Sequence, residues 1–216
     1  MRPRSSKTTA KTCGLSTPET VDAAIGGGAS HIGFVFFPRS PRNLSFDQAA
    51  GLAVRVPSHV KRVGVFVDPD DALIEQAIGA ARLDAVQLHK TAPDRIAHLR
   101  SAFHTEIWAA IAVKTRADLD AAHHYAGVAE RILYDAKTPE GALPGGMGVR
   151  FDWTLLDGFR HPLPWALSGG LHTDNVGEAI RRTGASLVDA SSGLETEPGV
   201  KSVDKITSFL QAVAAS

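Results

Sequence analysis

The chain has 216 residues, 44% hydrophobic and 21% charged, which is the composition of a globular protein long enough to bury a large core. Its 23 basic and 23 acidic side chains cancel, which excludes a global positive field for nucleic acid or an anionic membrane. A single cysteine, Cys13, excludes an internal disulfide and a zinc site built from cysteines. Since the chain has no apolar run of about 20 residues and no secretory signal, we expect a cytoplasmic protein.

The chain divides into a short tail and one long domain. We interpret residues 1–7 as a flexible N-terminal tail and residues 8–216 as the folded domain. Short apolar runs alternate with longer amphipathic runs throughout this domain, and the middle apolar runs are continuous, as expected for parallel strands buried on both faces. The expected strands are 8–13, 31–37, 61–67, 85–89, 106–113, 131–136, 165–169 and 187–191.

The segments between these strands predict helices, because several begin with capping side chains. Ser45 is followed by Gln48, which fits a capping box, and two other caps precede a proline at the first helical position. The last helix is expected at 202–214. The expected N-caps are Thr17 (before Pro18), Ser45, Asp68 (before Pro69), Thr115 and Thr173.

Eight strands alternating with helices predict a single-domain (β/α)8 barrel, the TIM barrel. The periodicity is equally compatible with a doubly wound open sheet. The count of eight and the lack of a GxGxxG motif after the first strand favour the barrel. The long irregular stretch 137–151 directly follows an expected strand, which places it on the catalytic face of a barrel.

Two expected strands end in side chains that can transfer protons. Cys13 ends the first strand, and Lys11 alternates with it, so the lysine can supply positive charge to a thiolate. The alternative is a buried, inert thiol. Asp135 ends the sixth strand, where an apolar pocket would keep it protonated as a general acid. A role as a helix cap, or in an ion pair with Lys137, would explain an aspartate at position 135 equally well.

Other polar residues at this face suit anion binding. Arg42, in the proline-stiffened loop after the second strand, can hold a carboxylate with its two-pronged guanidinium, and Arg39 is the competing candidate.

His89 and Asp189 also end strands, where they either line a pocket or make structural hydrogen bonds.

Two glycine-bearing turns, LSGGLHTDN and DASSGLE, follow the seventh and eighth strands. Barrels commonly bind phosphate at these two loops. We therefore favour a phosphate site there over two ordinary turns. The nine histidines show no metal-ligand spacing, so we expect neither metal nor cofactor.

The motifs, taken in order, resemble those of the phosphoribosylanthranilate isomerase family of tryptophan biosynthesis. The resemblance extends from about Lys11 to the last helix, and the pattern SSG-x-E-x-x-x-G-x-K near the end is its most specific part. Lys90 and Met147 stand where the family usually has glycine and threonine. The motifs are KTCGL, GASHIGFVFFPRSPRNLS, VGVFVD, VQLH, LYDAK, GGMGVRFDW, LSGGLHTDNV and VDASSGLETEPGVK.

The resemblance implies an Amadori rearrangement of N-(5-phosphoribosyl)anthranilate, a small phosphorylated substrate. By analogy, Asp135 is the general acid that opens the ring, and Cys13 is the general base that removes the C2 proton. Arg42 would bind the anthranilate carboxylate, with Asp189 and His89 as further substrate contacts. The implied phosphate-binding residues are Gly169, Gly170, Ser192 and Gly193.

Two other functions are considered. The first is a dual-substrate isomerase that also accepts the related aminoaldose of histidine biosynthesis. Such enzymes resemble this chain in fold but have an aspartate as the catalytic base at strand one, where this chain has Cys13. The second is a non-catalytic barrel that retains only a phosphate site, and the presence of both Cys13 and Asp135 argues against it. The sequence is compatible with a monomer or a homodimer, and we expect neither nucleic acid nor membrane as a partner.

Overall fold

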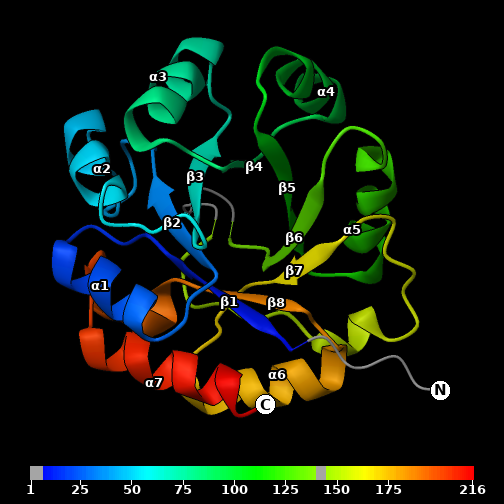
Figure 1. Cartoon of the computed structure of the whole chain (residues 1–216). Helices are drawn as coiled ribbons and strands as arrows, with labels where there is room; N and C mark the ends of the chain where they lie inside the picture. The colour runs from blue at the N-terminus through cyan, green and yellow to red at the C-terminus, as the bar shows by residue number, and fades with distance from the viewer. Residues whose placement is uncertain (1–6, 140–144) are drawn as a thin grey trace.

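The computed structural model describes residues 7–139 and 145–216, and residues 1–6 of the expected tail lie outside this range. Eight parallel strands form a closed barrel in chain order, and β8 pairs with β1 to complete it (Figure 1). This confirms the predicted barrel and rules out the open sheet. The strands are β1 (Thr9–Cys13), β2 (His31–Val35), β3 (Lys61–Val67), β4 (Ala85–His89), β5 (Glu106–Val113), β6 (Arg131–Ala136), β7 (Trp165–Leu167) and β8 (Leu187–Ala190).

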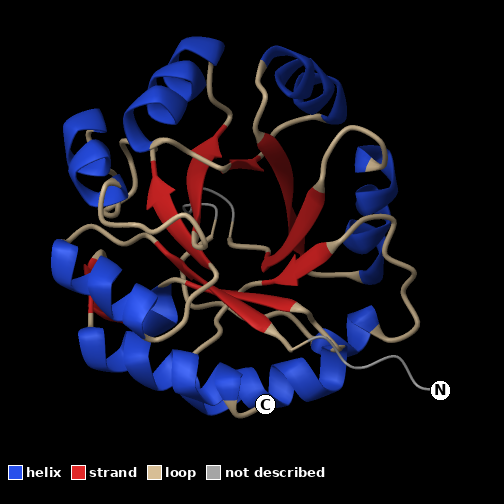
Figure 2. Ribbon diagram, viewed as in Figure 1, coloured by secondary structure: helices blue, strands red, loops and turns tan. Residues whose placement is uncertain are grey.

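Helices surround the barrel on the outside (Figure 2). Their buried faces pack on the outward side chains of the strands and form the larger apolar core. The α-helices are α1 (Pro18–Gly26), α2 (Phe46–Ala53), α3 (Asp71–Ala81), α4 (Pro93–Ala102), α5 (Arg116–Asp120), α6 (Thr173–Thr183) and α7 (Val203–Ala214). Among the described residues, the expected helix between β6 and β7 is replaced by the short 3-10 helix η2 (Trp153–Leu156). None of the helices in the described part is long and apolar enough to cross a membrane.

The helix starts follow the capping chemistry at most of the expected positions. Thr17 and Ser45 each form a capping box, and Thr115 is the N-cap of α5. The prediction for Asp68 is wrong, because α3 begins after Asp70, whose carboxylate accepts a hydrogen bond from the Leu73 amide.

Four further boundary predictions need correction, one helix start and three strand ends. The cap of α6 is His172, so Thr173 is already the first helical residue. The strands expected at 31–37, 165–169 and 187–191 end earlier, at Val35, Leu167 and Ala190. Phe36 and Ser168, the next residues after two of them, still donate to carbonyl oxygens of the neighbouring strands.

A small hairpin after β8 was not predicted. β9 (Glu195–Glu197) pairs antiparallel with β10 (Val200–Lys201) and follows the 3-10 helix η3 (Ser192–Leu194). Gly199 turns the chain with φ 87°, and a Cβ there would lie 2.7 Å from the carbonyl oxygen of Pro41. The hairpin therefore packs directly against the loop that follows β2.

Lys90, one of the departures from the family pattern, has φ 54°. This left-handed conformation favours glycine, since a side chain at positive φ meets the backbone. The geometry explains why glycine would suit this position.

The amino-terminal end of the barrel is closed by an inner apolar layer. It contains Trp108, which is fully buried and which also stacks edge-on against His31 at 5.2 Å between ring centroids. The guanidinium of Arg131 covers the indole at 5.0 Å. The layer consists of Val63, Ala85, Trp108, Leu133, Ala166 and Leu187.

We predict that Trp108→Ala destabilises the protein by about 3–5 kcal/mol, because it leaves a cavity in a layer that cannot collapse. Urea unfolding followed by circular dichroism measures the change. Val54→Ala, at a side chain that is 71% exposed, is the control and should change the free energy of unfolding by less than about 0.5 kcal/mol. A loss below about 1 kcal/mol for Trp108→Ala would show that the layer adapts.

Candidate active site

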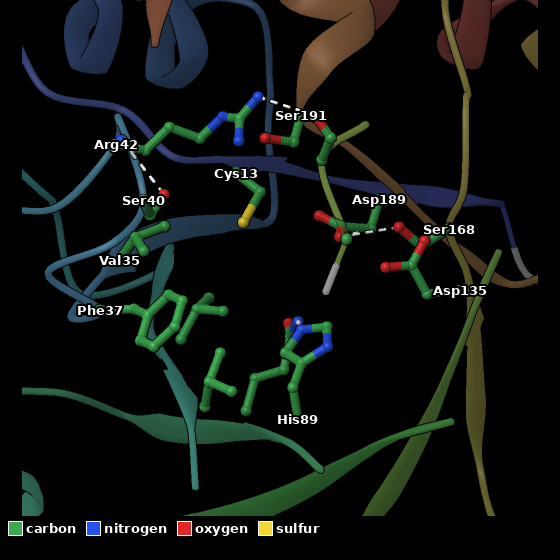
Figure 3. A pocket seen from close by; sticks show the side chains of 15 residues that line it. Cys13, Val35, Phe37, Ser40, Arg42, His89, Asp135, Ser168, Asp189 and Ser191 are labelled. Atoms are coloured by element: carbon green, nitrogen blue, oxygen red, sulfur yellow. Dashed lines mark hydrogen bonds between the residues drawn. The ribbon is translucent and has the colours of Figure 1, made fainter. Parts of the chain in front are cut away.

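A pocket opens at the carboxyl end of the strands, where the catalytic face of a barrel is expected. It encloses about 560 Å³, part of it open to solvent. Figure 3 shows Arg42 and Asp135 on opposite sides, with Cys13 between them and His89 across the pocket. Five residues predicted from the sequence thus share one cavity: Cys13, Arg42, His89, Asp135 and Asp189.

A buried ion pair lies beneath this pocket. Lys11 Nζ is 2.9 Å from Asp189 Oδ1, and the lysine is completely buried. Burial opposes the charge on Lys11, but the Asp189 carboxylate outweighs it and raises the pKa of the lysine. The second oxygen of Asp189 accepts a hydrogen bond from Ser168 Oγ at 3.2 Å. Asp189 is therefore fixed at both oxygens.

The thiol of Cys13 lies at the end of β1, above the ion pair. Burial raises the pKa of Cys13, and the positive charge of Lys11 opposes this effect. The apolar residues that contact the cysteine are Val35 and Val65, with Phe37 packed at the edge. A buried thiol beside a lysine can act as a base only while that positive charge is present.

Asp135 is the strongest candidate for a general acid. Burial raises the pKa of its carboxyl to about 7, and the negative charge of Asp189 adds to the effect. Its Oδ1 accepts a hydrogen bond from the backbone amide of Ala136 at 2.9 Å. A carboxyl with a pKa so far above its usual range can hold a proton near neutral pH, as general-acid catalysis requires.

His89 is held by its neighbour on β4, Gln87. The side-chain Nε2 atoms of the two residues are 2.9 Å apart. Burial, together with the positive charge of Lys11, lowers the pKa of His89 to about 4, so the imidazole is neutral at pH 7. The neutral ring can donate or accept a hydrogen bond, but it adds no charge to the site.

Arg42 is buried at the pocket wall, whereas the competing candidate Arg39 is exposed. Its Nε and Nη2 donate to Glu195 at 2.6 and 2.7 Å, and Nη2 also donates to the carbonyl oxygen of Gly146 at 2.9 Å. A Cβ on Gly146 would lie 2.6 Å from Arg42 Nη1, so only glycine allows this approach. Nε and Nη2 of the guanidinium thus have partners within the protein, whereas Nη1 has no hydrogen-bond partner among the described residues.

A smaller polar hollow adjoins the pocket on the side of β7 and β8. Gly169, Gly170 and Ser192 line it, together with Gly148 from the loop after β6. Asn175 fixes the turn after β7, because its side-chain Nδ2 donates to the carbonyl oxygen of Gly170 at 2.9 Å. Three of the four expected phosphate-binding residues therefore surround one hollow.

Gly193, the fourth, does not line the hollow. A Cβ at this residue would lie 2.1 Å from the carbonyl oxygen of Leu171, so Gly193 allows the turn after β8 to pack on the turn after β7. Its observed role is to bring the two turns together.

Two residues of this site had no predicted role, Glu195 and Lys201. Lys201 Nζ forms an ion pair with the same carboxylate of Glu195 that binds Arg42. Both residues belong to the SSG-x-E-x-x-x-G-x-K pattern, which was the only signal that the sequence contained. Their contact with Arg42 depends on the hairpin, whose position the sequence did not reveal.

The comparisons with known proteins agree with this geometry. A model of the family described as N-(5'phosphoribosyl)anthranilate (PRA) isomerase matches residues 10–212. The N-(5'-phosphoribosyl)anthranilate isomerase of Zymomonas mobilis subsp. pomaceae is 54% identical over 205 residues, which cover 94% of this chain and 96% of that protein. The corresponding protein of Rhodospirillum centenum is 48% identical over 95% of this chain and 97% of its own length.

Solved structures share the fold closely. The phosphoribosyl anthranilate isomerase of Thermotoga maritima has a TM-score of 0.86 and 33% identity over 97% of this chain and all of that chain. The fold and the comparisons define a (β/α)8-barrel isomerase. The chain belongs to the N-(5'-phosphoribosyl)anthranilate isomerase family.

We predict that Asp135→Asn stabilises the protein, and more so at pH 8 than at pH 4. The folded-state pKa of Asp135, about 7, lies above its unfolded value of about 3.9, so the wild type loses stability as the pH rises from about 4 through 7. Each unit of difference corresponds to about 1.4 kcal/mol. Urea unfolding of both proteins across this pH range measures the effect, and a pH-independent difference would contradict it.

Proposed function

We propose that this chain rearranges N-(5'-phosphoribosyl)anthranilate to 1-(2-carboxyphenylamino)-1-deoxyribulose 5-phosphate, with Asp135 as general acid and Cys13 as general base. The observation that carries the proposal is the pKa of about 7 for a buried carboxyl in a pocket that also contains a thiol. The reaction only moves protons, so an acid and a base suffice for it.

The two groups act in sequence. Asp135 protonates the furanose ring oxygen as the C1–O bond breaks, which leaves an iminium between C1 and the anthranilate nitrogen. The Cys13 thiolate then removes the proton from C2 and forms an enolamine. Protonation at C1 and loss of the C2 hydroxyl proton give the ketone, so the product is an isomer of the substrate.

The charges around the pocket support this assignment. Lys11 opposes the effect of burial on the Cys13 thiol, and Asp189 favours the protonated form of Asp135. Both effects come from the two members of one ion pair. The arrangement therefore favours the neutral acid that ring opening needs, and Lys11 gives the Cys13 thiolate a nearby positive charge that partly offsets the raised pKa of the thiol.

Binding at the two ends of the substrate supplies the geometry. Arg42 binds the anthranilate carboxylate, and the hollow lined by Gly169, Gly170 and Ser192 binds the phosphate. His89 and Asp189 contact the sugar between them. Arg42 lines the pocket but not the adjoining hollow, so the two anions of the substrate have separate binding groups.

The remaining expectations are part of the same proposal. The protein acts in the cytoplasm without metal or cofactor and recognises a small phosphorylated substrate rather than nucleic acid or a membrane. Whether it is a monomer or a homodimer is measured by sedimentation equilibrium.

The first test is the loss of phosphoribosylanthranilate fluorescence on addition of the purified wild-type protein, with a chelator present. We expect a rapid decay, well above the spontaneous rate and unaffected by the chelator. No acceleration by a folded protein would refute the proposed reaction, and loss of activity with chelator would refute the metal-free mechanism.

We predict that Cys13→Ala and Asp135→Asn each lower kcat by about 10²–10⁴-fold, the usual contribution of one proton-transfer residue. Both variants should keep the circular dichroism spectrum of the wild type. A folded variant that retains a near-normal kcat would remove that residue from the mechanism.

We predict that Arg42→Ala mainly raises KM, because the charge-assisted hydrogen bond to the carboxylate is lost while the proton-transfer groups stay in place. A rise of roughly 10-fold or more corresponds to the usual strength of such a bond. Arg39→Ala, at the exposed arginine of the same loop, is the matched control. An unchanged KM for Arg42→Ala would move the carboxylate site elsewhere.

A further inference from the structure

Three buried charges meet where the loop after β2 touches the β9–β10 hairpin. The side chains of Arg42, Glu195 and Lys201 are only 7%, 5% and 1% exposed. Arg42 Nε and Lys201 Nζ both donate to Glu195 Oε1. Two cations thus share one carboxylate in a place that water hardly reaches.

Lys201 also makes a second set of contacts. Its Nζ donates to the carbonyl oxygen of Ser191 at 3.0 Å and to Ser191 Oγ at 3.2 Å. Ser191 lines both the pocket and the adjoining hollow, and the next residue, Ser192, belongs to the proposed phosphate site. The Lys201 ammonium group therefore connects Glu195, the partner of Arg42, with the turn that follows β8.

We propose that Glu195 and Lys201 are positioning residues that connect the two anion sites: Glu195 orients the Arg42 guanidinium for the substrate carboxylate, and Lys201 holds Glu195 and the phosphate-binding turn in one arrangement. This inference rests on the proposed function of the site.

The role of Glu195 follows from the hydrogen bonds of Arg42. The carboxylate accepts from Nε and Nη2 at once, which fixes the plane of the guanidinium. The carbonyl oxygen of Gly146 accepts a further hydrogen bond from Nη2, and within residues 7–139 and 145–216 no acceptor contacts Nη1, which we assign to the ligand. Without Glu195, the arginine side chain would lose this fixed orientation and pay rotamer entropy when it binds a carboxylate.

The charge balance points to anionic ligands. The cluster contains two positive charges and one negative charge, so it carries one uncompensated positive charge. Burial favours the neutral form of Glu195, but hydrogen bonds from Arg42 and the charge of Lys201 outweigh it and lower the pKa of the carboxyl. An uncompensated buried charge is costly, and a bound anion would relieve that cost.

The test uses two simple anions that report on the two sites separately. Anthranilate reports on the carboxylate site and inorganic phosphate on the phosphate site, and binding of each to the full chain is followed by NMR titration. Since no turnover is needed, a failed isomerase assay and a failed coupling between the two sites are distinguishable.

We expect Glu195→Gln to weaken anthranilate binding by roughly 10-fold, the usual value of a charge-assisted contact. Phosphate binding should change less than about 2-fold, because Lys201 keeps its own hydrogen bonds to Ser191 in this variant. Glu197→Gln, at the exposed acid of the same strand, is the matched control and should leave both affinities unchanged. Equal losses for both anions in Glu195→Gln would show a merely structural effect and overturn the proposal.

Lys201→Met should weaken both anions. In the double variant with Glu195→Gln, Lys201→Met should add little to the loss of anthranilate binding, because Lys201 acts on the carboxylate site through Glu195. The same double variant should still bind phosphate more weakly than Glu195→Gln alone. If the losses of anthranilate binding in the two single variants add up in the double variant, the proposed connection through Glu195 is overturned. The control is Lys205→Met, since exposed Lys205 donates to the backbone carbonyl oxygen of Glu195 and, among the described residues, to no side chain of the cluster.

If Glu195→Gln does not fold, Ser191→Ala provides an independent test. It removes only the hydroxyl that Lys201 contacts at 3.2 Å. Phosphate binding should weaken several-fold, the usual effect of one lost hydrogen bond, while anthranilate binding stays as in the wild type. Unchanged phosphate affinity would overturn the role of Lys201 at the phosphate-binding turn.

Discussion

The ion pair between Lys11 and Asp189 is the interaction on which the site depends. It crosses the seam where β1, the first strand, pairs with β8, the last, so it lies where the barrel closes. Loss of either partner would leave a buried charge without compensation, at a cost of about 3–5 kcal/mol. The same two charges influence the pKa values of Cys13 and Asp135. Closure of the barrel and tuning of the acid and base are therefore one arrangement.

Burial has opposite consequences for stability and for chemistry at this site. It raises the pKa of both Asp135 and Cys13, which suits the acid and opposes the base. Lys11 lowers, and Asp189 raises, the pKa of both groups; for Asp135 burial and Asp189 outweigh the lysine, and for Cys13 the lysine reduces the effect of burial without reversing it. Burial thus makes the ionised carboxyl of Asp135 less stable, and for the same reason this acid is partly protonated at neutral pH.

The outer part of the proposed anion sites is held by contacts within the protein itself. The hairpin between β8 and α7 brings Glu195 and Lys201 to Arg42, and the close approach of Gly199 to Pro41 holds the two loops together. Preorganisation of this kind lowers the entropy lost on binding. It also explains why a segment without catalytic groups, the hairpin, contains the Glu and Lys of the most specific sequence pattern.

The sequence by itself determined the barrel, the approximate strands, most helix starts and five residues that line the pocket, because hydrophobic periodicity and capping are local and strand ends in a barrel converge at one face. Only the tertiary structure decided that Arg42 binds Glu195, that Gly193 packs on Leu171 rather than lining the hollow, and that burial brings the pKa of Asp135 to about 7. Arg42 and Glu195 are 153 positions apart in the chain, and Lys11 and Asp189 are 178 apart. Contacts over such separations, and the desolvation that shifts a pKa, arise only when the barrel closes and excludes water from its interior.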